Sequence, residues 1–405
     1  MNEKKILTVN SGLACLLKDR QGVLDNYDSV MINSGTVIVS AEISAKLTAK
    51  GGSINSGNLQ VKEIRGEIVQ LEKDAVIDGN TGLKDLFVIA KDRLLVTKEG
   101  MKKLVEADGL MALGTVYYPE SGDMAGLAKI SGEKKAYPDN CEIFLGDKNL
   151  ETLVGANGAG KKHIWVSGRL TALDKKTFDR ARSLGLTVTC SKFFSYEGLN
   201  SEYGDMITCT ERILVPDGYE ITGKIDASEL ALYGPKIYAD GNFTMAEKDI
   251  PALEEVQSII VKGKATLPAS AVKLFRSRGK ADKYFVFEGR LCEINGFEQL
   301  THGMLDASSK KGEKITYLVN GCIMFDSDVT AEDMECIASL SYNGTVLIPS
   351  DVKSSLAVKV KQGNGFMGDP DKLSELTGKN LKDLIKGVTG ESGDSTLNLG
   401  TYILA

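Results

Sequence analysis

The stretch of this 405-residue chain that most suggests chemistry is a glycine-rich loop, Gly155-Ala-Asn-Gly-Ala-Gly160-Lys161-Lys162. Closely spaced glycines leave backbone N–H groups free to point at one anion, and the lysine that follows adds positive charge. Such a loop can hold a phosphate group. The next residues, HIWVSG at 163–168, include Ile, Trp and Val, which favour a strand.

The loop resembles the nucleotide-binding loop of P-loop ATPases, with Gly155, Gly160 and Lys161 at matching positions. Lys162 stands where that family has a Ser or Thr hydroxyl for Mg²⁺. The family loop also opens a helix, whereas a strand is predicted here. Other Gly/Lys-rich loops precede predicted strands, as in SRGKADKYFVFEG. We therefore interpret the loop as structural and predict no cofactor, and nucleotide binding stays an alternative.

Residues for other reactions are few. The two histidines, His163 and His302, have no obvious nucleophile nearby in the sequence, and no GxSxG or HExxH pattern occurs. The seven cysteines form no CxxC pair, which is typical of buried free thiols in a reducing compartment. The acidic run at 326–335 lacks the spacing of a calcium loop, so it predicts helix capping and a solvated face. We predict no catalytic or metal-binding residue, and hence a protein that is not an enzyme.

Composition points to a soluble globular protein. The net charge is −6, which argues against nucleic acid as a partner because binding phosphates needs clustered Lys and Arg. The first residues lack the apolar core of a signal peptide, and no apolar run approaches the roughly 18 residues of a membrane span. We therefore expect no membrane partner and a cytoplasmic location.

The elements that must position any site are repeated units. Residues 315–362 contain the same pattern twice: an apolar strand, an Asn-Gly pair, a second apolar run, a capping residue and a short helix. The pairs Asn320-Gly321 and Asn343-Gly344 predict turns. Related glycines recur at intervals of 22 or 23 residues, as at positions 12, 35, 57 and 79, and again at 241 and 263. One such unit cannot bury its own apolar face, so it must stack on neighbours.

The spacing Leu253-x-x-Val256-x-x-Ile259-x-Val261, followed by Gly263, resembles a leucine-rich repeat. That resemblance implies a right-handed α/β horseshoe whose parallel strands line a concave binding face. We predict an α/β repeat solenoid of stacked parallel strands and short helices over residues 1–362. Residues 1–85 are its more β-rich part, and residues 363–405 form a C-terminal cap or tail with one amphipathic helix. A parallel β-solenoid with helical insertions would leave nearly the same pattern.

Counting back from the repeated glycine separates two faces of each strand. Positions −2 and −4 are apolar in several late strands and predict the core face. Position −3 then carries five apolar side chains on the opposite face: Trp165, Tyr238, Ile260, Val286 and Leu318. If the strands stack in register, these five form an apolar stripe and a possible partner surface. Burial against another part of the chain, or in a parallel sheet covered on both faces, is the alternative.

In the N-terminal repeats, Asn10, Asn33 and Asn55 share position −2 and predict a structural ladder of asparagines that bond the turn backbone. Together these patterns favour a non-enzymatic binding or scaffolding protein that uses a solenoid surface for a protein partner or for self-association. A self-assembling structural protein is the second hypothesis, since an uncapped array can stack end to end. A nucleotide-binding protein using Gly155–Lys161 is the third.

Overall fold

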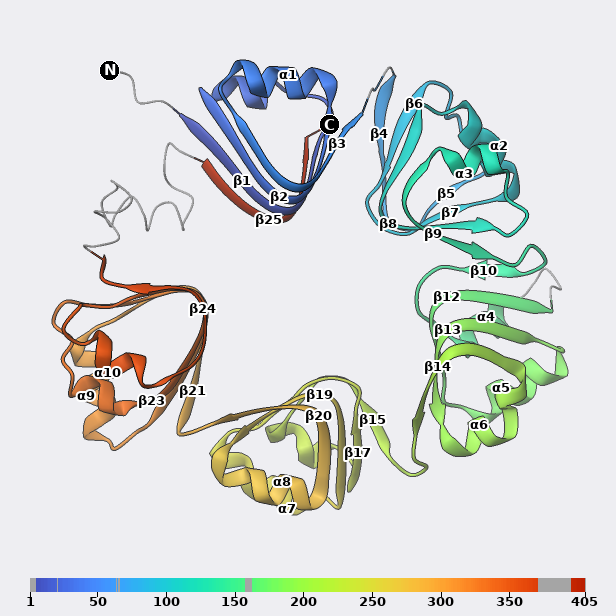
Figure 1. The fold of residues 1–405 in the computed structure, drawn as a ribbon. Coiled ribbons are helices and arrows are strands. Elements are labelled where there is room, and N and C mark those ends of the chain that lie inside the picture. The colour runs from blue at the N-terminus through green and yellow to red at the C-terminus, as the bar shows by residue number, and fades with distance from the viewer. Residues whose placement is uncertain are drawn as a thin grey trace. The chain divides into compact units, whose positions relative to one another are not determined.

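The computed structural model describes residues 5–19, 21–62, 64, 66–156, 162–370 and 395–404. The chain forms two compact units: residues 1–215 together with 386–405 are unit 1, and residues 216–385 are unit 2. Both are α/β. The described strands group into five sheets with parallel pairing, named A to E in chain order (Figure 1).

Unit 1 contains sheets A, B and C. Sheet A, in the order β25-β1-β2-β3, consists of β1 (Ile6–Leu16), β2 (Ser29–Ser40), β3 (Ser53–Lys62) and β25 (Ser395–Leu404). Sheet B, in the order β4-β6-β8-β7-β5 with β9 beside β8, consists of β4 (Glu67–Leu71), β5 (Ala75–Ile77), β6 (Leu86–Ala90), β7 (Leu94–Val96), β8 (Gly109–Pro119) and β9 (Ile130–Tyr137). Sheet C, in the order β10-β12-β13-β14 with β11 beside β12, consists of β10 (Glu142–Phe144), β11 (Lys148–Asn149), β12 (His163–Ala172), β13 (Thr187–Tyr196) and β14 (Ile207–Val215). The helices are α1 (Ala41–Ala49), α2 (Lys98–Glu106), α3 (Met124–Ala128), α4 (Leu150–Ala156), α5 (Lys175–Ser183) and α6 (Glu197–Tyr203), with short 3-10 turns η1 (Val23–Asn26) and η2 (Gly204–Met206).

Unit 2 contains sheets D and E. Sheet D, in the order β15-β17-β19-β18-β16 with β20 beside β19, consists of β15 (Glu220–Thr222), β16 (Ile225–Asp226), β17 (Lys236–Ala239), β18 (Phe243–Thr244), β19 (Ser258–Pro268) and β20 (Gly279–Phe287). Sheet E, in the order β21-β22-β23-β24, consists of β21 (Arg290–Leu300), β22 (Ile315–Phe325), β23 (Ile337–Leu347) and β24 (Val360–Gly368). The helices are α7 (Ile250–Glu254), α8 (Val272–Arg278), α9 (His302–Lys310) and α10 (Lys353–Ala357), with 3-10 turns η3 (Ala227–Leu232), η4 (Glu247–Asp249), η5 (Ala269–Ala271) and η6 (Asp333–Cys336).

Several neighbouring strands pair at the interval that the repeated glycines predict. In sheet A, Val9 is the register partner of Ile32, and Ile32 is the partner of Ile54. In sheet E, Val319 is the partner of Tyr342. The predicted parallel pairing is confirmed, but the interval of 22 or 23 residues does not hold for every pair, since Glu220 pairs with Ile237 and Arg290 pairs with Ile315.

The Asn-Gly pairs are not turns, so that prediction is wrong. Strand β22 runs without a break through Asn320-Gly321. The φ angles of Gly321 and Gly344 are +133° and +135°, a region that only glycine enters readily. A Cβ atom on Gly344 would overlap the carbonyl oxygen of Gly321 in the strand beside it. Glycine is needed here because the backbones of neighbouring strands approach closely, and not because the chain turns.

The predicted core face is largely correct. The buried −2 and −4 residues are Ile164, Val166, Ile259, Val261, Tyr317, Val319 and Phe287, whereas Phe285 is half-buried. In sheet E, Leu305 of α9 and Leu356 of α10 are fully buried in the same core as Val319. The apolar spacing of 101, 104 and 105, and of 178, 181 and 184, also predicts two helix faces, but Val105 and Leu184 are 40% and 46% exposed. Each lies at or near the end of its helix, where the chain leaves the sheet.

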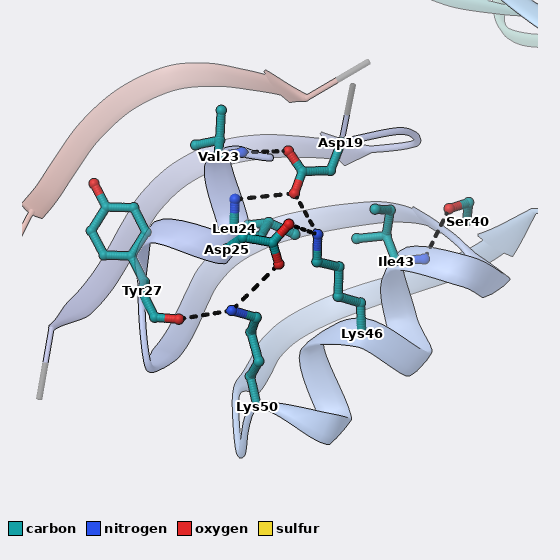
Figure 2. Close-up of polar contacts among 9 residues, drawn as sticks. All are labelled: Asp19, Val23, Leu24, Asp25, Tyr27, Ser40, Ile43, Lys46 and Lys50. Carbon is teal, nitrogen blue, oxygen red and sulfur yellow. Dashed lines mark hydrogen bonds and ion pairs between the residues drawn. The ribbon is translucent and has the colours of Figure 1, made fainter. Parts of the chain in front are cut away.

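A polar cluster fastens α1 to the segment that follows β1 (Figure 2). The side chain of Asp19 is only 3% exposed. It accepts hydrogen bonds from the backbone N–H groups of Val23 and Leu24, at 2.7 and 3.1 Å, and from Lys46 Nζ at 2.9 Å. Lys46 also pairs with Asp25 at 2.7 Å, and this hydrogen bond lowers the pKa of Asp25 and raises that of Lys46. One lysine therefore joins a helix to two carboxylates of the preceding repeat.

The predicted asparagine ladder is present. The amide of Asn33 donates to Asn10 Oδ1 at 2.9 Å, and the amide of Asn55 donates to Asn33 Oδ1 at 2.8 Å. The side chains bond one another rather than the backbone of a turn, which corrects the predicted bonding. A second ladder that the sequence analysis missed crosses sheet E at register partners Asn295, Asn320, Asn343 and Asn364.

The repeat does not stop at residue 362 as predicted. Strand β24 continues to Gly368 and carries the fourth asparagine of the sheet E ladder. Strand β25, which was read as part of a cap or tail, pairs with β1, and Leu404 packs in the core of sheet A (Figure 1). The amphipathic helix expected around Leu373–Ile385 lies outside the described residues.

Candidate binding groove

A groove of about 1310 Å³ lies within unit 2, between sheet D and the start of β21. One wall comes from β16, β18 and β19, in which Ile225, Phe243 and Ala265 are register partners and fully buried. Because successive residues of a strand point to opposite faces, the preceding residues point away from the core. The groove is lined by those residues, Lys224, Asn242 and Lys264.

The second wall consists of the first residues of β21 and the loop that precedes β22. Arg290 begins β21, and its backbone N–H donates to the carbonyl oxygen of Lys314 at 2.7 Å. Thr316 donates its hydroxyl to the carbonyl oxygen of Glu288 at 2.9 Å. These bonds hold the loop before β22 against the start of β21, so side chains from both segments line one wall.

The groove contains charges of both signs. Its cationic residues are Lys224, Lys264, Arg290 and Lys314, and its acidic residues are Asp226, Glu229, Glu247, Glu288, Glu293 and Glu313. Lys314 Nζ donates to the carbonyl oxygen of Glu335 at 2.6 Å. Within the described part of the chain, Lys224, Lys264 and Arg290 form no ion pair with a carboxylate, so these cations are available to a ligand.

Two of the lining residues are oriented by local contacts. The Ser228 hydroxyl and backbone N–H hydrogen bond to Asp226 and hold the pKa of its carboxyl below the usual range, with Lys224 contributing a smaller electrostatic effect. The backbone N–H of Lys264 donates to Asn242 Oδ1 at 2.9 Å, and its Nζ lies 5.6 Å from the centre of the Phe285 ring. The groove therefore presents an ionised carboxylate on β16 and a positioned ammonium group on β19, with β18 between the two strands.

The structure does not bring the five predicted stripe residues together. Trp165 lies in sheet C, Tyr238, Ile260 and Val286 in sheet D, and Leu318 in sheet E. Only Tyr238 and Ile260 are register partners. Val286 is the register partner of Leu267, whereas the partner of Ile260 on the same strand is Lys280. The prediction of one apolar stripe is therefore wrong.

Two of the five are also unavailable as a free surface. Trp165 is half-buried, with its ring centre 5.4 Å from that of Tyr117 and 6.1 Å from that of Tyr137, so it fills a contact between sheets B and C. Tyr238 is 1% exposed. Val286 is 46% exposed. Ile260 and Leu318 are half-buried. For Trp165 and Tyr238, burial against other parts of the chain is therefore the correct interpretation.

The glycine-rich loop has the wrong neighbours for a phosphate loop. Gly155 lies in the last turn of α4, and β12 begins at His163. A helix thus precedes the loop and a strand follows it, the reverse of the strand–loop–helix order that points a helix N-terminus at phosphate. Lys161 lies outside the described residues.

Both histidines are held by hydrogen bonds. His163 Nδ1 lies 2.9 Å from Thr187 Oγ1. His302, expected in a loop, is the first residue of α9, and its Nδ1 lies 2.8 Å from a carboxylate oxygen of Asp333, whose side chain is 4% exposed. The hydrogen bond to the Asp333 carboxylate raises the pKa of His302. Thr330 also donates its N–H to Asp333 at 2.7 Å, but Glu332 precedes the turn η6 and Asp333 is buried, so the solvated face predicted for the acidic run does not include Asp333.

The seven cysteines are free, and five of them are buried. Burial raises the pKa of the Cys15 and Cys190 thiols to about 12, so neither is a thiolate at neutral pH. No cluster of three or more His, Cys, Asp or Glu within the described ranges is placed to hold a metal ion. None of the helices in those ranges combines the length and the apolar character of a bilayer-spanning segment.

The groove was not predicted, because only the residues before each repeated glycine were compared. The residues directly after Gly223, Gly241 and Gly263 are Lys224, Asn242 and Lys264. Aligning the residue that follows each glycine would have suggested a column of polar side chains across sheet D. The opposite wall had no such signal. Comparison of the chain with protein-family models, curated proteins and solved structures found no match.

Proposed function

We propose that this protein is a non-enzymatic binding or scaffolding protein, and that the groove of unit 2 holds an extended segment of a protein partner. The proposal includes a leucine-rich-repeat-like solenoid architecture, a cytoplasmic location, and no bound cofactor or nucleic acid. The parallel strands paired at 22- or 23-residue intervals support the repeat architecture. The seven free cysteines support a reducing compartment.

The observation that carries the proposal is the size and charge of the groove. At about 1310 Å³ it exceeds the roughly 300–1,000 Å³ of a typical small-molecule pocket. Its unpaired cations, Lys224, Lys264 and Arg290, lie in the same groove as acidic residues such as Glu293 and Glu313. A peptide with side chains of both signs complements such a lining, and charge complementarity also selects against other partners.

Selection from a displayed library of random dodecapeptides on the full-length protein tests this proposal. Enriched peptides are then measured by fluorescence polarisation against Lys224→Glu/Lys264→Glu. We expect affinity to fall at least about tenfold, since reversing two charges replaces attraction by repulsion. The matched control is Lys283→Glu, because Lys283 is exposed and is the register partner of Lys264 but does not line the groove.

Two results would overturn the proposal. One is a selection that yields no peptide whose binding depends on the groove. The other is equal loss of affinity in the Lys283→Glu control, which would mean that the effect comes from net charge rather than from the groove.

A further inference from the structure

Sheet E ends in two unpaired edge strands. Within the described residues, β21 pairs only with β22, and β24 pairs only with β23. Asn295 and Gly296 are exposed in β21, and residues 361–365 are exposed in β24. An exposed edge offers a row of backbone N–H and C=O groups to another strand.

The asparagine ladder gives the two edges opposite hydrogen-bonding character. Asn320 donates its amide to Asn295 Oδ1 at 3.3 Å, and Asn364 donates its amide to Asn343 Oδ1 at 2.8 Å. Both bonds run from the later strand to the earlier one, from β22 to β21 and from β24 to β23. Within the described residues, the amide NH₂ of Asn295 remains as a donor at one edge, and the amide oxygen of Asn364 remains as an acceptor at the other.

The close stacking of glycines on neighbouring strands ends at β21. A Cβ atom on Gly321, Gly344 or Gly365 would overlap the carbonyl oxygen of the glycine in the preceding strand. Gly296 has a similar φ angle of +113°, but a Cβ atom there would meet nothing within 4 Å. The position that a neighbouring strand's backbone occupies beside the other three glycines is open beside Gly296.

We propose that β24 of one copy of this chain pairs in parallel with β21 of a second copy, so that sheet E continues across the two. In this register Asn364 of one copy lies opposite Asn295 of the next, and the ladder continues with its donors in the same direction. Gly365 of the first copy lies opposite Gly296 of the second. The carbonyl oxygen of Gly365 then occupies the open position beside Gly296.

The same register brings two aromatic side chains together. Phe366 of one copy lies opposite Phe297 of the next, which is 37% exposed. Facing aromatic side chains on paired strands are among the favourable cross-strand pairs. The contact is head-to-tail, because it joins two different edges rather than one edge to itself.

Sheet A shows that this chain already adds a distant strand in the same way. Strand β25 follows β1 by most of the sequence, yet it pairs with β1 in parallel and places Asn398 opposite Asn10. Sheet A carries Asn-x-Gly in these strands, whereas sheet E carries Asn-Gly. The occupant that matches β21 is therefore β24 of another copy, and not β25.

The test uses full-length protein and multi-angle light scattering over a range of concentrations. We expect the mass of the wild-type protein to rise with concentration. Asn295→Lys and Asn364→Lys each place a charge on one of the two edges, and each variant alone is expected to lose association. Asn55→Lys is the matched control, because Asn55 lies on the edge strand β3 of sheet A.

Mixing the two edge variants gives the sharper result. Asn295→Lys keeps an intact β24 edge and Asn364→Lys keeps an intact β21 edge, so an equimolar mixture is expected to form a one-to-one dimer. Recovery on mixing also demonstrates that both variants are folded. A wild-type protein that stays monomeric, a mixture that stays monomeric, or equal loss of association in Asn55→Lys would each overturn the proposal.

Discussion

The glycine stack of sheet E can be tested by adding a single methyl group to Gly344. Gly344 lies in the middle of β23, at a φ angle of +135°, and is the register partner of Gly321. In Gly344→Ala the new Cβ atom would overlap the carbonyl oxygen of Gly321. That oxygen belongs to the backbone of a paired central strand, so it cannot move aside without disturbing β22.

Two effects determine how much Gly344→Ala lowers the free energy of unfolding. Holding a non-glycine residue in this backbone region costs about 1–3 kcal/mol. Forcing an extra carbon into a filled position costs about another 1–3 kcal/mol. We therefore expect the free energy of unfolding of the sheet E region to fall by about 2–6 kcal/mol. At roughly 1.4 kcal/mol per tenfold change, the lower value corresponds to an opening equilibrium about 30-fold more favourable.

The measurement must report on unit 2 separately. The single tryptophan, Trp165, lies in unit 1, so its fluorescence does not follow sheet E. Hydrogen exchange followed by mass spectrometry, on peptides covering β22 and β23, gives the local opening equilibrium.

The matched control is Gly303→Ala in α9, where a Cβ atom would meet nothing within 4 Å. There the same substitution should leave stability unchanged or raise it by about 0.5–1 kcal/mol. Equal exchange in the two variants would refute the stacking explanation.

Three further predictions concern polar contacts. Asn33→Ala removes two ladder hydrogen bonds and should lower the unfolding free energy of unit 1 by about 1–2 kcal/mol, measured by urea denaturation with tryptophan fluorescence; an unchanged midpoint would contradict it. Asp19→Ala removes the carboxylate that two backbone N–H groups and Lys46 share, and it should lower the free energy of unfolding by about 2–3 kcal/mol in the same assay. The control is Asp25→Ala, which should have a far smaller effect because the Asp25 side chain is 60% exposed. The folded-state pKa of His302 is above its ordinary value of 6.5, so its pairing stabilises fully below pH 6.5 and is lost as pH rises through the folded-state pKa. The difference in melting temperature between wild type and His302→Gln, followed by circular dichroism, should therefore be larger at pH 6 than at pH 8.5, and a difference independent of pH would disprove the linkage.

Several elements could be predicted because their signals are local. The three-residue spacing of Asp174 and Thr177 encodes a helix cap, and the Thr177 N–H donates to the Asp174 carboxylate at 2.9 Å at the start of α5. The reciprocal bonds between Thr330 and Asp333 follow from their three-residue spacing. A cap depends on residues within one turn of a helix, so a short stretch of sequence specifies it.

The candidate site could not be predicted in the same way. The groove combines Lys224 and Lys264 of sheet D with Arg290 and Lys314 beside sheet E. The first pair lie in one column of sheet D, each directly after a glycine. The second pair lie on the opposite wall only because β21 and the loop before β22 are bonded to each other, and no periodicity in the sequence reports that contact.

By itself, the sequence determined the α/β class, the parallel pairing of strands and most of the positions that face the cores, because the apolar periodicity of a strand is local. Only the tertiary structure decided where each sheet begins and ends, that Trp165 is enclosed by Tyr117 and Tyr137, and that β25 joins β1. Strand pairing depends on which edges remain free after folding. Two segments from opposite ends of a chain can satisfy the same edge without any local pattern that links them.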